Sequence, residues 1–258
     1  MKIGFFDSGL GGLTVLKESI KQLPNEEYIY LADNLNAPYG NKPKDIVKKY
    51  IFKNVQVLLD NGVEAIVIAC NTATAIAIDD LRKQYSNIKV IGTEPAVKPA
   101  IELVKNTNLK VLIVATSLTI KEEKLKLLIK KLNAEKIVDL LSLGKLVNYA
   151  ESNNYNDEVI EKYLNDELKD KDINSYGVVV LGCTHFSIFR HNFENVFNKN
   201  TKIIDGNIGI VNYLKKFVIK DKNKFGNVTI LMTEETDDFK NSSKNILNYD
   251  NIIYKKID

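Results

Sequence analysis

The feature that most constrains the fold of this chain is an alternation of short apolar runs with longer segments of helical periodicity. Runs such as residues 65–69 and 177–181 are rich in β-branched residues and are apolar at nearly every position. Strands that are apolar on both faces are typical of parallel sheets covered by helices on both sides. The repeated order of strand and helix therefore predicts an α/β fold with mostly parallel sheets flanked by helices.

The predicted elements follow this alternation along all 258 residues, a length that fits one large or two modest domains. Strands are expected at residues 3–6, 28–31, 65–69, 89–91, 109–114, 137–141, 177–181, 202–204 and 228–231. Helices are expected at residues 13–22, 44–61, 75–85, 95–105, 120–132, 157–169, 207–220 and 237–248.

A weak internal repeat divides the chain into two parts. Residues 2–8 resemble residues 110–116, and residues 63–74 resemble residues 175–186, with similar offsets. The repeat predicts two pseudo-symmetric α/β domains. Open α/β sheets bind ligands at the carboxyl ends of their strands, so the two halves would present these ends to one another. We therefore expect the active site in the interdomain cleft.

Each of the two cysteines follows an apolar strand, and polar residues come directly after it. Cys70 precedes amide and hydroxyl side chains, and Cys183 precedes Thr184 and His185. A free cysteine is most often a small buried apolar residue, but two equivalent positions favour chemistry. Backbone N–H groups at the start of a following helix favour anions and lower the pKa of a thiol. A thiolate beside a bound carboxylate is therefore one interpretation.

Other interpretations of the cysteines and histidines remain open. His185 would share a face with Cys183 if the strand continues, so the pair could form the dyad of a hydrolase, although Cys70 then has no role. The wide separation of the cysteines argues against structural zinc, whose ligands usually come in closely spaced pairs. His191 lies in an amphipathic stretch without polar companions and is interpreted as structural.

Two loops at strand ends add polar groups. Residues 7–12 form a glycine-rich turn that lacks the spacing of phosphate-binding motifs and would present Asp7 and Ser8. An ionised Asp7 would accept a hydrogen bond from an ammonium group or a thiol. In residues 33–40, the N–H groups of Tyr39 and Gly40 would face a carboxylate. This placement suits an amino-acid substrate.

Composition excludes several classes of protein. The net charge of +3 is spread along the chain, which gives no support to nucleic-acid binding. Two cysteines in 258 residues exclude a disulfide framework and favour a reducing compartment. The start of the chain has no secretory apolar region, and no run is long enough to span a membrane. We expect a cytoplasmic protein with no membrane partner.

Taken together, these residues resemble the cofactor-independent glutamate racemases of the aspartate/glutamate racemase superfamily. The hallmarks stand at residues 7–12, at Asp33 with residues 37–40, at residues 69–74, at Gly92 with residues 94–96, and at residues 181–185. The resemblance extends from end to end and implies that the end of the chain returns to the first domain. The first domain is then residues 1–94 and 206–258, with Cys70, and the second is residues 95–205, with Cys183.

The resemblance also implies roles for individual residues. Cys70 and Cys183 would flank the substrate Cα, assisted by Asp7 and His185, with Glu151 orienting the histidine. Two cysteines are needed because a single base that returns its proton to the same face restores the original enantiomer. The implied substrate-binding residues are Asp7, Ser8, Pro38, Tyr39, Gly40, Asn71, Thr72, Thr74, Thr116, Thr119, Thr184 and His185. No pyridoxal phosphate, other cofactor or metal is implied.

The implied activity is the interconversion of L-glutamate and D-glutamate, which would supply D-glutamate for peptidoglycan, in a protein that is often a homodimer. The chain departs from the family pattern at Asn36, where arginine is frequent, and at the domain crossing, residues 92–95. Racemisation of aspartate or another amino acid remains an alternative. A binding protein that keeps the cleft without turnover is another.

Overall fold

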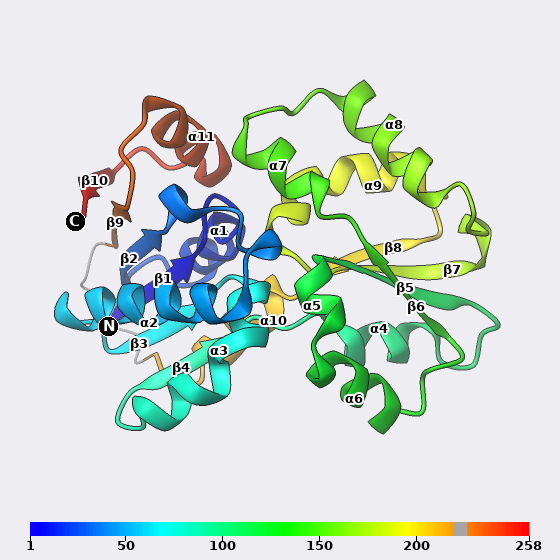
Figure 1. Ribbon diagram of the computed structural model, residues 1–258, viewed down its shortest axis with the longest axis horizontal. Helices are drawn as coiled ribbons and strands as arrows, with labels where there is room; N and C mark the ends of the chain where they lie inside the picture. Colours follow the sequence, from blue (N-terminus) through cyan, green and yellow to red (C-terminus); the bar gives the residue numbers. More distant parts are fainter. Residues whose placement is uncertain (219–225, 258) are drawn as a thin grey trace.

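The computed structural model describes residues 1–218 and 226–257, which form two parallel sheets with helices on both faces (Figure 1). The six-stranded sheet has the order β10-β9-β2-β1-β3-β4, and the four-stranded sheet has the order β6-β5-β7-β8. The strands of the two sheets are β1 (Lys2–Asp7), β2 (Glu27–Ala32), β3 (Ala65–Ile68), β4 (Lys89–Gly92), β5 (Lys110–Ala115), β6 (Val138–Ser142), β7 (Tyr176–Leu181), β8 (Lys202–Asp205), β9 (Asn227–Met232) and β10 (Ile252–Lys256). The expected α/β architecture is confirmed.

The six-stranded sheet separates two apolar layers because successive side chains of a strand point to opposite faces. Phe5 packs with α1 (Leu13–Gln22), α10 (Asn207–Leu214) and α11 (Asp237–Leu247), whereas Phe6 packs with α2 (Lys44–Asp60) and α3 (Asn71–Gln84). Both phenylalanines have no exposed surface. Full burial of such a side chain stabilises the fold by about 1.5–3 kcal/mol.

The four-stranded sheet is built in the same way. Val114 and Leu181 face α7 (Lys145–Glu151), α8 (Asp157–Leu168) and α9 (Arg190–Val196). On the other face, Ile113 and Val180 pack with α4 (Val97–Val104) and α6 (Glu123–Lys131). We call the part built on the six-stranded sheet the first half of the molecule and the part built on the four-stranded sheet the second half. The two halves meet where the short helix α5 (Ser117–Lys121) lies beside helix α3 of the first half.

The internal repeat of the sequence corresponds to a repeat in topology. β1 lies between β2 and β3 with β4 beyond, and β5 lies between β6 and β7 with β8 beyond. Cys70 therefore follows β3, and Cys183 follows the equivalent strand β7. β9 and β10 have no counterpart in the second sheet and extend the first sheet beyond β2.

Several element boundaries differ from the prediction. Helix α3 begins at Asn71 rather than at residue 75, because the Cys70 sulfur accepts the Ala73 N–H and caps the first turn. The helix expected at 120–132 is two helices, α5 and α6, because Glu122 between them is extended. The helix expected at 207–220 is too long, because α10 ends at Leu214 and residues 215–217 form a turn, while residues 219–220 lie outside the described residues. Helices α7 and α9, the 3-10 helix Thr184–Phe189 and strand β10 were not predicted.

Candidate active site

The first half of the site lies at the neighbouring carboxyl ends of β1 and β3. Asp7 ends β1, and Cys70 stands at the N-terminus of α3 with its sulfur 3.4 Å from the Ala73 nitrogen. The Ser8 hydroxyl lies 3.8 Å from the same sulfur. All three side chains are buried, with at most 5 % of their surface exposed. The thiol is thus held by a hydroxyl and by the start of a helix.

The Asp7 carboxylate is held from both halves of the molecule. The Gly9 N–H donates to Oδ1 at 2.8 Å, and the Thr184 hydroxyl, next to Cys183, donates to Oδ2 at 3.3 Å. Burial raises the pKa of Asp7 above its ordinary value, although the charge of His185 and the Gly9 N–H act in the opposite direction. A carboxyl group with a raised pKa is suited to proton exchange.

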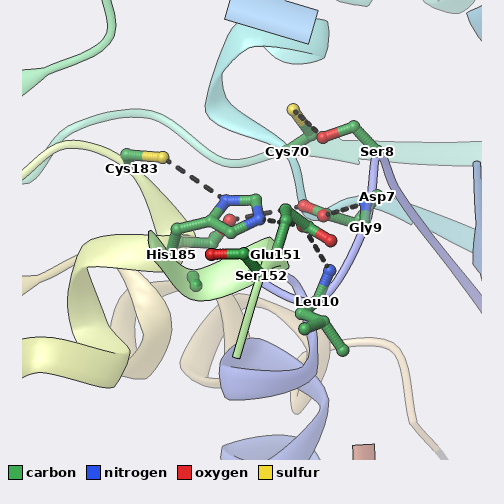
Figure 2. A network of polar contacts seen from close by, with 12 residues as sticks. Asp7, Ser8, Gly9, Leu10, Cys70, Glu151, Ser152, Cys183 and His185 are labelled. Carbon is green, nitrogen blue, oxygen red and sulfur yellow. Dashed lines mark hydrogen bonds and ion pairs between the residues drawn. The ribbon is translucent and has the colours of Figure 1, made fainter. Parts of the chain in front are cut away.

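The second half of the site is a chain of polar contacts that begins at Cys183. Its sulfur lies 3.7 Å from Nδ1 of His185, and Nε2 of the same ring lies 2.5 Å from Oε1 of Glu151 (Figure 2). The Leu10 N–H, from the glycine turn of the first half, donates to Oε1 at 2.9 Å. Glu151, at the end of α7, therefore connects the histidine to the opposite half of the molecule.

The two cysteines have different electrostatic surroundings. Burial raises the pKa of the Cys70 thiol, and the Asp7 carboxylate raises it further, so Cys70 keeps its proton near neutral pH. Burial lowers the pKa of His185, but hydrogen bonds to Cys183 and Glu151 outweigh burial and place its pKa well above the ordinary value. An imidazolium beside Cys183 stabilises negative charge on that sulfur. A charge on Cys183 also raises the pKa of Cys70, so the cysteines lie within electrostatic reach of each other.

The glycines of the turn allow the two halves to approach closely. A Cβ on Gly9 would lie 2.0 Å from Oε1 of Glu151. A Cβ on Gly11 would lie 2.5 Å from Nδ1 of His185 and 2.6 Å from the Thr184 hydroxyl. Only residues without a side chain fit here, so the glycine-rich sequence serves contact between the halves rather than phosphate binding.

The predicted substrate-binding hydroxyls form a second cluster across the interface of the halves. The Thr72 hydroxyl lies 2.9 Å from that of Thr116, which lies 3.1 Å from that of Thr119. Gly40 lies against Thr116, with room for no more than a tight Cβ contact at 3.3 Å. The Tyr39 hydroxyl donates to buried Asp33 at 2.5 Å, which leaves the backbone of Tyr39 and Gly40 beside the threonines.

Not every predicted residue is free to contact a substrate. The Thr74 hydroxyl donates to the Ile68 carbonyl at 3.1 Å and accepts the Thr93 N–H at 3.0 Å, so it joins β3 to the end of β4. The Asn71 amide donates to the Thr93 carbonyl at 3.0 Å. Pro38 precedes Tyr39 and contributes no N–H. These three residues stay predictions as substrate contacts.

Sequence reasoning did not assign two buried groups that support the site. Asp33 accepts hydrogen bonds from Tyr39 and Asn36, and its position at the end of β2 was the available signal. Tyr30, within β2, donates to the Gly9 carbonyl at 2.7 Å, whereas the sequence predicts it only as part of an apolar strand. His191 does have a polar companion, because its Nε2 lies 2.6 Å from Asp157 on the surface.

The space beside the site and the distribution of possible metal ligands bear on what the site can bind. A mostly apolar cavity of about 170 Å³ borders it, lined in part by Asn71, Thr74, Thr93 and Thr119. Among residues 1–218 and 226–257, no group of three or more His, Cys, Asp or Glu side chains is placed to hold a metal ion. None of the helices in the described part of the chain is long and apolar enough to cross a membrane.

Known proteins resemble this chain in sequence along most of its length. The sequence pattern of the family described as Asp/Glu/hydantoin racemase matches residues 13–214, which is most of the chain. The chain belongs to this family. Glutamate racemase 2 of Bacillus subtilis is 50 % identical to it over 226 residues, which cover 88 % of this chain and 84 % of the relative. The expectation of an amino-acid racemase, an isomerase, is confirmed for this member of the Asp/Glu/hydantoin racemase family.

Solved racemase structures share the whole fold. The glutamate racemase isoform RacE1 of Bacillus anthracis superposes with a TM-score of 0.88 at 26 % identity, covering 99 % of this chain and 97 % of that one. The glutamate racemase of Francisella tularensis, solved in complex with D-glutamate, has a TM-score of 0.86 at 27 % identity and covers 100 % of this chain and 97 % of its own. The resemblance stated from the five motifs is confirmed.

Proposed function

We propose that this racemase interconverts L-glutamate and D-glutamate by a two-base mechanism. One observation carries the proposal. Buried Cys70 and Cys183 follow equivalent strands of the two sheets, and each has its own acid–base partner, Asp7 with Ser8 on one side and His185 with Glu151 on the other. Relatives named glutamate racemase, and one such structure that holds D-glutamate, support the choice of substrate.

The proposed reaction moves one proton on each face of the substrate. A thiolate on one face takes the Cα proton, the C–H electron pair stays on the carbanion, and the thiol on the other face gives its proton to Cα. The cysteines have then exchanged protonation states, and the product is the opposite enantiomer. In the absence of substrate, burial and the Asp7 carboxylate keep Cys70 as the thiol. The raised pKa of His185 keeps an imidazolium beside Cys183, which can exchange a proton with that sulfur.

The remaining predicted residues are proposed to bind the substrate. Ser8, Asn71, Thr72 and Thr184 lie near the cysteines and would hold the α-amino and α-carboxylate groups. The backbone N–H groups of Tyr39 and Gly40, with Thr116 and Thr119, would hold the side-chain carboxylate. Hydrogen bonds to an ionised carboxylate are stronger than those between neutral groups, so a few such donors can hold it.

The cellular role follows from the activity and from the two free, buried cysteines. We place the enzyme in the cytoplasm, where thiols remain reduced, and assign it the supply of D-glutamate for peptidoglycan. The proposed enzyme is a homodimer that needs no added cofactor and binds no nucleic acid. Its proposed domains are residues 1–94 with 206–258, and residues 95–205, since β1 to β4, β9 and β10 form one sheet and β5 to β8 the other.

The test is proton NMR of L-glutamate in D2O with the purified protein and no added cofactor, with D-glutamate followed by chiral chromatography. Loss of the Cα proton together with formation of D-glutamate is expected. A parallel panel with aspartate and other amino acids separates glutamate racemisation from that of another substrate. A folded protein that binds glutamate without exchange or product would show a binding protein instead.

The Cys70→Ala and Cys183→Ala variants test the two-base step. Each is expected to abolish racemisation, because the proton donor or the proton acceptor is missing. Each variant keeps one cysteine on one face, so it should exchange the Cα proton with solvent deuterium from one enantiomer only, and the two variants should prefer opposite enantiomers. Racemisation at the wild-type rate by either variant would refute the mechanism.

A further inference from the structure

A tyrosine buried beside the glycine turn has no role in the proposed mechanism. Tyr30 lies in the interior of β2, next to β1, and has no exposed surface. Its hydroxyl donates to the Gly9 carbonyl at 2.7 Å. No other described group donates a backbone hydrogen bond to that carbonyl. Among the described residues, the hydrogen bond to the Gly9 carbonyl of the turn therefore comes from the Tyr30 hydroxyl alone.

The Gly9–Leu10 peptide group connects this hydroxyl to the second half of the site. A trans peptide is planar, and its C=O and N–H point in opposite directions. The carbonyl of this peptide accepts from Tyr30, and its N–H, which belongs to Leu10, donates to Oε1 of Glu151 at 2.9 Å. The same oxygen contacts Nε2 of His185. A change in the tilt of this one peptide changes the position of Glu151.

The N–H on the other side of Gly9 acts on the first half of the site. It donates to Oδ1 of Asp7 at 2.8 Å. Both carboxylates that accompany the two cysteines thus depend on one residue of backbone. The space around the hydroxyl is tight, since a Cβ on Gly12 would lie 2.9 Å from the oxygen of Tyr30 and 2.6 Å from the Cβ of Asp7.

The Tyr30 hydroxyl also remains a hydrogen-bond donor at every pH near neutrality. Burial raises its pKa well above the ordinary value, and the charges of Asp7 and Glu151 raise it further. The hydroxyl therefore keeps its proton and cannot turn into an acceptor that would repel the Gly9 carbonyl.

We propose that Tyr30 is a positioning residue for the racemase reaction, which orients the Gly9–Leu10 peptide so that its flanking N–H groups hold Asp7 and Glu151. This inference rests on the proposed function for its kinetic consequence. Its structural consequence, the position of Glu151 against His185, is independent of the substrate.

The chain contains a matched control two residues away. Tyr28 lies on the same strand and the same face as Tyr30 and is 1 % exposed. Its hydroxyl donates to backbone carbonyls as well, at 2.7 Å to Leu23 and 3.1 Å to Ser19, at the end of α1 away from the cysteines. Tyr30→Phe and Tyr28→Phe therefore remove the same atom from comparable surroundings.

The kinetic test measures kcat and KM for both enantiomers in the two variants. Tyr30→Phe should lower kcat by about 10-fold or more in both directions with KM changed less than about 3-fold, because misplaced acid–base groups slow the chemical step. Tyr28→Phe should keep kcat within about 2-fold of wild type. Equal kcat values for the two variants in an active enzyme would overturn the inference.

A spectroscopic test does not require turnover. The chain has two histidines, so a protein labelled with 15N-histidine gives two imidazole signals, which His191→Gln assigns. The pKa of His185 should fall in Tyr30→Phe, because Glu151 is no longer held against the ring, and should stay unchanged in Tyr28→Phe. The signal of exposed His191 serves as an internal reference. An unchanged His185 titration in Tyr30→Phe would overturn the inference even if the wild-type protein does not racemise glutamate.

Discussion

Replacement of Gly11 by alanine tests whether contact between the halves positions the second acid–base group. The new Cβ would lie 2.5 Å from Nδ1 of His185 and 2.7 Å from the backbone nitrogen of the same residue. Ordinary contact begins near 3.4 Å, so one side must move by about 0.9 Å. Rotation of the ring relieves only the first contact, because the second involves backbone. The displaced atom, Nδ1, is the one that lies 3.7 Å from the Cys183 sulfur.

The expected magnitudes follow from this displacement. Insertion of a methyl group into a packed interior costs about 1–3 kcal/mol of unfolding free energy. A shift of roughly 1 Å in a catalytic group lowers the rate by about 100-fold. Gly11→Ala should therefore lower kcat/KM for glutamate by about 100-fold and lower the free energy of unfolding by about 1–3 kcal/mol.

The assay follows racemisation by circular dichroism and measures unfolding in urea. Gly209→Ala is the control, because that glycine is an exposed residue of α10 with nothing within 4 Å of an added Cβ. Since alanine favours a helix over glycine, this variant should be about 0.5–1 kcal/mol more stable with unchanged activity. If Gly11→Ala keeps activity within about 3-fold of wild type and its full stability, the argument from close approach is wrong.

Two further predictions concern charge. Burial raises the pKa of Asp7 above its ordinary value of 3.8, so the folded protein loses stability as the pH rises from 3.8 through the pKa of Asp7 in the folded state. Asp7→Asn removes this ionisation and should therefore raise the free energy of unfolding at neutral pH. Urea unfolding should show this gain at neutral pH and none below about pH 4, and a variant less stable than wild type at both would contradict it. Lys44 and Glu122 form an ion pair of 2.9 Å between α2 and the α5–α6 junction, so Lys44→Met should raise KM by about 1.5- to 5-fold and reduce its dependence on salt. Lys48→Met, which breaks a pair with Asp80 inside the first half, should leave KM unchanged.

Much of the fold could be predicted because its signals are local. Residues such as Phe5 and Phe6 are apolar on both faces of β1, which marks a strand inside a covered parallel sheet. Strand β10 escaped prediction because it is a short edge strand with two lysines, partly exposed along its length. Helix α3 was predicted to begin too late, since a cysteine cap has no recognised sequence signal.

Contacts that depend on tertiary structure could not be predicted from residue patterns. The motifs brought Cys70, Cys183, Asp7 and His185 into one hypothesis. The structure places Ser8 beside Cys70, His185 beside Cys183, and Thr184 in contact with Asp7. The hydrogen bond between Leu10 and Glu151 joins residues 141 positions apart. Its donor is a backbone N–H, which nearly every residue has, so the sequence cannot indicate it.

The return of the chain to its first sheet has a consequence for synthesis on the ribosome. β2 pairs with β9 from Glu27↔Asn227 to Ala32↔Met232, so this edge of β2 has no partner until the last part of the chain has been made. The four-stranded sheet draws only on residues between Lys110 and Asp205 and is complete earlier. During translation, an apolar strand edge near the N-terminus thus stays open and prone to wrong pairing while the later sheet closes. The sheet that begins first is the last to be finished.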